Sequence, residues 1–263
     1  MKLYIVDAFT NKPYRGNPAA ICLLDAEITD FRMQNIAAEM NLSETAFLYK
    51  QEEGYSLRWF TPESEVDLCG HATLASAHIL WEEQISQDSV IRFATKSGTL
   101  LAAKRNNWIE LDFPLEEEEP SMNTPQKLVD GLGADFLYIG KNRLDYIIEL
   151  ESEEKVHSLK PDFHLWKQVD ARGVIVTSRS ERNNVDFVSR CFYPRLGVNE
   201  DPVTGSAHCC LGPYWSKKLQ KNALEALQLS KREGLLKLLI GEGRILISGQ
   251  AVTVLKGELL NDG

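Results

Sequence analysis

Short runs of apolar and β-branched residues, separated by turn residues, recur along the whole chain. Runs of this length and composition predict strands. The strands predicted in the first half cover residues 2–9, 18–24, 45–50, 56–60, 90–95, 100–105 and 108–113. Those predicted in the second half cover residues 136–140, 146–150, 173–177, 185–192, 236–240, 244–248 and 252–255. Helical spacing predicts helices at residues 30–40, 125–132 and 163–169. Many short strands with few helices indicate an α+β fold built on curved sheets.

Two further helical patterns resemble each other. The residues Gly-His-Ala-Thr begin at Gly70, and Gly-Ser-Ala-His begin at Gly205, 135 residues later. Small and apolar residues recur at helical spacing after each motif, which predicts two closely packed helices. The offset is about half of the chain and predicts an internal repeat. Pro213 removes one backbone donor from the second helix and predicts a kink there.

An acidic run framed by prolines, Pro-Leu-Glu-Glu-Glu-Glu-Pro-Ser, occupies residues 114–121. From composition alone, a solvated loop and a linker explain it equally well. Its position near the midpoint favours an interdomain linker. We therefore predict an N-terminal α/β domain of residues 1–114 and a C-terminal α/β domain of residues 115–263. Whether the last strands return to the first domain stays open.

Composition and charge narrow the classes of function. The chain has 263 residues, of which 43% are hydrophobic and 25% charged, as in folded globular proteins. The 29 Lys+Arg and 38 Asp+Glu give a net charge of −9, which argues against binding to nucleic acid or to anionic membranes. No run approaches the ~18 apolar residues of a transmembrane helix. The five cysteines show no disulfide or zinc spacing, which favours reduced thiols and a cytoplasmic location.

The starts of the two repeated helices are candidate anion sites. Backbone N–H groups and the positive end of the helix dipole lie at Gly70 and Gly205, where a carboxylate or phosphate could bind. Ordinary capping by Asp67 and by Ser206 is the alternative. The acidic Asp201 lies just before the second helix. An acid beside an anion site suits proton abstraction next to a carboxylate, although Asp201 could also simply form a turn.

Three more side chains could take part in chemistry. Glu44 is flanked by small and apolar residues, and burial would raise its pKa into the range of a general acid/base; a surface glutamate is the alternative. Asn17, in a turn before a strand, could bond the backbone or a ligand. Cys69 precedes a helix start, which lowers a thiol pKa. The histidine spacings suggest no metal site.

Several of these residues belong to motifs that are familiar together. They are Asp-Ala-Phe-Thr at 7–10, Gly-Asn-Pro-Ala at 16–19, Asn-Leu-Ser-Glu-Thr at 41–45, Leu-Cys-Gly-His-Ala-Thr at 68–73 and Glu-Asp-Pro-Val-Thr-Gly-Ser-Ala-His at 200–208. Their order and spacing resemble the PhzF-like, or phenazine biosynthesis-like, family of isomerases and epimerases. The resemblance covers nearly the whole chain.

The resemblance implies the diaminopimelate-epimerase-like fold. In that fold two similar domains are related by a pseudo-twofold axis, and each is a curled, barrel-like mixed β-sheet around a central helix. The resemblance also implies a homodimer that needs no cofactor. In the best-known branch of the family the substrate is a dihydro-3-hydroxyanthranilate, on which a carboxylate base moves a proton between carbons.

The resemblance assigns roles by motif position. Glu44 is the implied general acid/base, with His71 and Asp201 as further catalytic residues. The implied substrate ligands are Asn17, Gly70, Gly205 and Ser206. Gly70, Gly205 and Ser206 would contribute backbone N–H groups, and Ser206 also belongs to the polar site. The implied substrate is a small carboxylate, and no metal is implied.

Two other functions stay open. One is a non-catalytic protein that binds small acids on the same fold. The other is an amino-acid racemase that uses Cys69. Related epimerases place a thiol on each side of a Cα, whereas this chain has Thr204 at the position that matches Cys69.

Overall fold

Strands β1 (Lys2–Ala8) and β18 (Ala251–Glu258) pair antiparallel in the computed structural model, which describes residues 1–260. This pairing places the late strand β18 with the beginning of the chain. The chain divides into two units. Unit 1 consists of Met1–Asp112 together with the chain from Ser248 onward, and unit 2 is Phe113–Ile247.

Unit 1 is a mixed sheet with two helices. Its further elements are β2 (Asn17–Leu23), α1 (Asp30–Met40), β3 (Glu44–Gln51), β4 (Gly54–Phe60), β5 (Glu65–Val66), α2 (Gly70–Glu82), β6 (Val90–Thr95), β7 (Gly98–Arg105) and β8 (Trp108–Pro114). The predicted helix at 30–40 and the predicted strand at 90–95 agree with α1 and β6 to the residue. Thr29 caps α1 by accepting a hydrogen bond from the backbone N–H of Arg32, which fixes where this helix begins.

Unit 2 has the same kind of sheet. Its elements are β9 (Glu119–Pro120), α3 (Gln126–Leu132), β10 (Tyr138–Lys141), β11 (Asp145–Glu149), α4 (Glu153–Ser158), α5 (Phe163–Trp166), β12 (Gly173–Arg179), β13 (Phe187–Tyr193), a 3-10 turn (Pro194–Leu196), β14 (Val198–Asp201), α6 (Gly205–Leu219), β15 (Ala223–Gln228), β16 (Gly234–Ile240) and β17 (Arg244–Gly249). The last two residues of β8 and of β17 lie beyond the bounds of the unit in which each strand begins.

The order of strand pairing confirms the internal repeat. Along β1-β2-β3-β4-β6-β7 the successive pairs are antiparallel, parallel, antiparallel, parallel and antiparallel. Along β10-β11-β12-β13-β15-β16 the sequence of pairs is identical. The second parallel connection contains α2 in unit 1 and α6 in unit 2. These helices begin at Gly70 and Gly205, the residues that start the two matching motifs.

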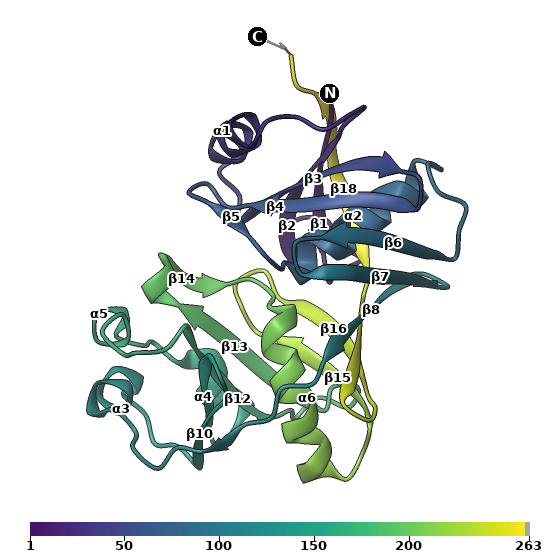
Figure 1. The fold of residues 1–263 in the computed structure, drawn as a ribbon. Coiled ribbons are helices and arrows are strands. Elements are labelled where there is room, and N and C mark those ends of the chain that lie inside the picture. Colours follow the sequence, from purple (N-terminus) through teal and green to yellow (C-terminus); the bar gives the residue numbers. More distant parts are fainter. Residues whose placement is uncertain (261–263) are drawn as a thin grey trace. The chain divides into compact units, whose positions relative to one another are not determined.

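Helix α2 runs through the core of unit 1 (Figure 1). Every residue from His71 to Ala77 is buried, and so are Ile79 and Leu80. Burial on all faces requires neighbouring backbones to approach closely, which the alanines and serine of this helix allow. The helix contacts β1, β2 and β3 as well as β18. The sequence therefore predicted a central helix correctly from its small residues.

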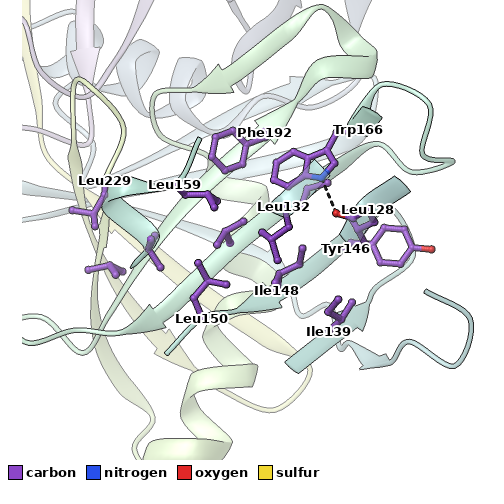
Figure 2. Close-up of a cluster of buried hydrophobic side chains, with 14 of the residues drawn as sticks. Leu128, Leu132, Ile139, Tyr146, Ile148, Leu150, Leu159, Trp166, Phe192 and Leu229 are labelled. Carbon is purple, nitrogen blue, oxygen red and sulfur yellow. Dashed lines mark hydrogen bonds between the residues drawn. The ribbon is translucent and has the colours of Figure 1, made fainter. Parts of the chain in front are cut away.

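The core of unit 2 includes an aromatic and aliphatic cluster, shown in Figure 2. Trp166 of α5 packs against Phe192 of β13, with ring centroids 5.3 Å apart. Its indole Nε1 donates to the carbonyl oxygen of Leu128 over 3.0 Å, so the buried N–H has a partner. This hydrogen bond links α5 to α3.

Helix α6 continues through Pro213 without interruption. The proline leaves the carbonyl oxygen of Cys209 without its usual intrahelical donor. The backbone N–H of Glu116 donates to that oxygen over 3.1 Å. The acidic segment of residues 114–121 thereby supplies the donor that the helix lacks. Within residues 1–260, no helix has the length and apolar character that crossing a bilayer would require.

Candidate functional site

A strained turn delivers Asn17 to the first position of β2. Phe9, Tyr14 and Gly16 have φ angles of 62°, 67° and 63°. The Asp7 carboxylate accepts from the backbone N–H of Tyr14 over 2.6 Å and fastens the turn to β1. A Cβ atom on Gly16 would lie 2.0 Å from the carbonyl oxygen of Ala8, so only glycine fits there.

The side chains of Glu44 and His71 meet in unit 1. Glu44 is the first residue of β3, and His71 is the second residue of α2. His71 Nε2 lies 3.3 Å from Glu44 Oε2. The exposed fractions of the two side chains are 8% for His71 and 21% for Glu44, so the carboxylate keeps access to small molecules while the ring is enclosed.

Two further side chains contact the His71 ring, and a third contacts one of these two. Asn17 Nδ2 lies 3.4 Å from Nδ1, and Cys69 Sγ lies 3.5 Å from the same nitrogen. Ser43 Oγ donates to Asn17 Oδ1 over 3.4 Å. Four predicted site residues of the first half, Asn17, Glu44, Gly70 and His71, are therefore brought together, and Cys69 with them.

The environment of Glu44 changes its acidity. Burial raises the pKa of this carboxyl above its usual range, and a hydrogen bond with Ser43 opposes part of the rise. A carboxyl with a raised pKa is a stronger base when ionised. It also gives up its proton closer to neutral pH, as a general acid/base requires.

Glu44, Cys69 and His71 also offer the types of atom that bind transition metals. One ligand atom from each lies within 4.8 Å of the others. The sulfur approaches Nδ1 at 3.5 Å and Nε2 at 4.0 Å, whereas the carboxylate approaches Nε2. One imidazole nitrogen binds one ion, and the nitrogen closest to the sulfur is not the nitrogen closest to the carboxylate. The start of α2 also carries positive potential. The arrangement therefore suits proton transfer better than cation binding.

In unit 2, Asp201 and Thr204 form a polar network before α6. The Thr204 hydroxyl donates to Asp201 Oδ2. Gln228 of β15 donates through Nε2 to the carbonyl oxygen of Asp201 over 2.8 Å and accepts through Oε1 from the backbone N–H of Thr204, also over 2.8 Å. These bonds orient the Asp201 carboxylate and fix the position at which α6 begins.

Arg172 lies beside Ser206, and the sequence analysis did not identify it. Its guanidinium binds both carboxylate oxygens of the buried Asp145, with Nε 2.9 Å from Oδ1. One of its terminal nitrogens lies 3.5 Å from Ser206 Oγ. The Arg172 side chain is 28% exposed, and its ion pair with Asp145 holds the guanidinium N–H donors in place at the start of α6. The sequence around Arg172 gives no sign of the ion pair with Asp145, because Asp145 is 27 residues away.

Neither repeated helix has a side-chain cap. The N-cap residues are Cys69 for α2 and Thr204 for α6, and neither side chain bonds its helix. The alternative of capping by Asp67 or Ser206 is therefore wrong. Gly205 and Ser206 are the first two residues of α6, as Gly70 and His71 are of α2, so unit 2 gathers Asp201, Gly205 and Ser206.

A family model described as phenazine biosynthesis-like protein matches residues 6–257. The chain belongs to this family. An uncharacterized isomerase of Halalkalibacterium halodurans is 60% identical to it over 259 residues, which is 98% of both chains. An uncharacterized isomerase of Pseudomonas aeruginosa is 46% identical over 98% of both chains. Relatives in the phenazine biosynthesis-like family thus carry the name isomerase, and the protein is an enzyme of this class.

Solved structures agree with the fold. The phenazine biosynthesis protein of the PhzF family from Enterococcus faecalis is 44% identical and superposes with a TM-score of 0.93 over 99% of both chains. A probable proline racemase from Agrobacterium radiobacter, solved with bound carbonate, is 10% identical and has a TM-score of 0.65 over 99% of this chain and 93% of that one. The first relative shares family and fold with this phenazine biosynthesis-like protein, and the second shares the fold alone.

We expect Gly16→Ala to destabilise the protein by roughly 1–3 kcal/mol, the cost of a strained backbone position. The added Cβ would clash with the carbonyl oxygen of Ala8 and force the turn to shift. Chemical denaturation measures the loss. Gly98→Ala is a matched control, because that residue also has a positive φ, of 97°, but a Cβ there meets no atom within 4 Å. Equal losses in both variants would show that the clash has no role.

Proposed function

We propose that this family member is a cofactor-independent isomerase that transfers a proton on a small carboxylate-bearing substrate, with Glu44 as the general acid/base. The observation that carries the proposal is the Glu44 carboxyl, which is partly buried, has a raised pKa and lies 3.3 Å from His71. A single carboxyl can remove a proton from one carbon and return it to another. Such a step needs no redox change and no second base.

His71 supports Glu44 in this scheme. An imidazole N–H donor beside the ionised carboxylate favours the charged form and holds one oxygen in place. The second oxygen of Glu44 is then available to the substrate proton. In this proposal His71, which the sequence predicted as a catalytic residue, acts by orienting the base.

The start of α2 supports binding of an anion near Glu44. Gly70 begins this 13-residue helix, whose N-terminus bears partial positive charge and no side-chain cap. Such a terminus binds a carboxylate without a basic side chain. It also offsets the repulsion between the substrate carboxylate and ionised Glu44.

The unit 2 residues are proposed as ligands for polar groups of a substrate. Gly205 and Ser206 would contribute through the start of α6, and Arg172 adds a guanidinium at Ser206. Asp201, whose carboxylate is oriented by Thr204, would accept a hydrogen bond from a hydroxyl or amino substituent. A guanidinium and a carboxylate together suit a substrate that carries both an acid and a donor group.

Proton NMR in D₂O tests the proposal. Wild-type protein is incubated with dihydro-hydroxyaromatic acids and with amino acids. We expect deuterium to enter a carbon-bound position of at least one acid. Absence of deuterium from every compound, combined with a raised Tm in the presence of the same acids, would instead favour the non-catalytic binding protein.

The racemase that uses Cys69 is a second candidate, and the contact of Cys69 Sγ with His71 favours it. A two-base racemase needs a partner thiol, but Thr204 stands at the matching helix start and its hydroxyl donates to Asp201. The two cysteines of α6, Cys209 and Cys210, do not supply this partner thiol, because burial raises the pKa of both to about 12. Deuterium at the Cα of an amino acid that is lost in Cys69→Ala would favour this candidate.

A further inference from the structure

Asn17 makes contacts that differ from those of a substrate ligand. Its side chain is fully buried, and its amide nitrogen lies 3.4 Å from Nδ1 of His71. An amide nitrogen can only donate a hydrogen bond. The ring nitrogen that faces it must therefore accept, and Nδ1 carries no proton.

The absence of a proton on Nδ1 determines what faces Glu44. A neutral imidazole carries one proton, which must then be on Nε2. Nε2 is the nitrogen 3.3 Å from Glu44 Oε2. The Nε2–H group can therefore donate to the carboxylate. The opposite tautomer would place a lone pair against a negative charge.

Two neighbours agree with this assignment. Ser43 Oγ lies 3.4 Å from Asn17 Oδ1, so a hydroxyl lies on the oxygen side of the amide when its nitrogen faces His71. The single hydroxyl proton of Ser43 can be donated either to this oxygen or to Glu44. Cys69 Sγ lies 3.5 Å from Nδ1, and a protonated thiol is also a weak donor toward an acceptor nitrogen. The bond from Asn17 to Nδ1 and the bond from Nε2–H to Glu44 then run in the same direction through the ring.

We propose that Asn17 is a positioning residue that holds His71 in its Nε2–H tautomer, so that His71 fixes the carboxylate of Glu44 by a hydrogen bond. The catalytic part of this inference rests on the proposed function of Glu44. The tautomer is a property of the protein without substrate and can be measured alone. The same turn that only Gly16 permits delivers the amide, which explains why a strained segment precedes β2.

Nitrogen NMR of protein labelled with ¹⁵N-histidine tests the tautomer, at a pH where the His71 ring is neutral. The spectrum of His71→Gln identifies the His71 signals. In the wild type we expect Nδ1 in the range of an unprotonated ring nitrogen and Nε2 in the range of a protonated one. If the Asn17 amide were rotated by 180°, Oδ1 would face Nδ1 of His71. The spectrum would then show the reverse, a protonated Nδ1 and an unprotonated Nε2. A protonated Nδ1 in the wild type would overturn the proposal, and no variant is needed for this result.

Asn17→Asp provides the second arm. The introduced carboxylate has the same shape but can only accept, so it should draw a proton onto Nδ1. We expect the Nδ1 signal to move into the protonated range. Exchange of deuterium into substrate should fall on the order of 10–100-fold, the loss typical when a partner that orients a metal-binding histidine is replaced. Asn107→Asp, at an exposed turn of unit 1, should change neither quantity. An unchanged His71 spectrum in Asn17→Asp would contradict the role of Asn17.

The outcomes separate this inference from the proposed function. If Glu44→Gln keeps proton transfer while His71 shows the Nε2–H tautomer, the function assigned to Glu44 fails and the role of Asn17 in fixing the ring stands. If Glu44→Gln is inactive and His71 carries its proton on Nδ1, the proposed function stands and the role of Asn17 fails.

Discussion

Glu44→Gln should lose on the order of 10²–10⁴-fold in the rate of proton transfer, the usual contribution of a positioned general acid/base. The amide has nearly the shape of the carboxyl and can still bond Nε2 of His71, but it cannot take a proton. Uptake of deuterium by a substrate, followed by NMR, measures the rate. The effect should appear in turnover rather than in binding, because the amide preserves the contacts of the site.

The stability of the same variant provides an independent check. Because burial raises the folded pKa of Glu44, the unfolded chain releases this proton first as pH rises, and ionising the carboxyl costs stability above about pH 4.3, the ordinary value of glutamate. Glu44→Gln should therefore be at least as stable as the wild type at pH 7, and the difference should shrink in acid. Glu63→Gln, an exposed position, should leave rate and stability unchanged. Wild-type turnover in Glu44→Gln would refute the role of Glu44.

The second large effect concerns His208 in α6. Its ring is fully buried, and burial lowers its pKa to about 4. Nδ1 lies 2.8 Å from the carbonyl oxygen of Thr204 and donates to it, and no described residue offers a hydrogen bond to Nε2. In the unfolded chain the ring takes up a proton near pH 6.5. Between pH 6.5 and 4 only the unfolded state binds this proton, so stability falls as pH falls.

The expected loss is about 3 kcal/mol between pH 6.5 and 4, since one pKa unit corresponds to about 1.4 kcal/mol. Denaturation curves at a series of pH values measure it. In His208→Asn the amide can still donate to Thr204 but does not titrate, so this part of the pH dependence should disappear even if the variant is less stable throughout. His157→Asn, at an exposed position, serves as the control. A pH dependence in His208→Asn equal to that of the wild type would refute the assignment.

The sequence predicted those elements whose local pattern and tertiary role agree. Helix α1 and strand β6 have clear periodicity and turn residues at their ends. Strand β15 was missed because Ala-Leu-Glu-Ala-Leu-Gln has the composition of a helix. It is a strand because it pairs with β13 on one side and β16 on the other, and tertiary pairing outweighs its local preference.

The same distinction applies to the site. Motif order predicted Glu44 and His71 as site residues, but it contained no information on distances. The pairing of Arg172 with Asp145 joins residues 27 positions apart across parallel strands β11 and β12, where no local pattern marks it. The contact of Asn17 with His71 likewise depends on the turn at Gly16, whose backbone angles only the folded chain reveals.

The pairing of β18 with β1 has a consequence for synthesis on the ribosome. Unit 2 is one continuous stretch, Phe113–Ile247, whereas the strand that pairs with β1 follows it. The second unit can therefore complete its core before the first, although unit 1 begins the chain. Until Ala251 and the residues after it emerge, β1 keeps an unpaired edge that can recruit other strands. Strand β1 is thus synthesised before unit 2 but gains its second neighbour only after it.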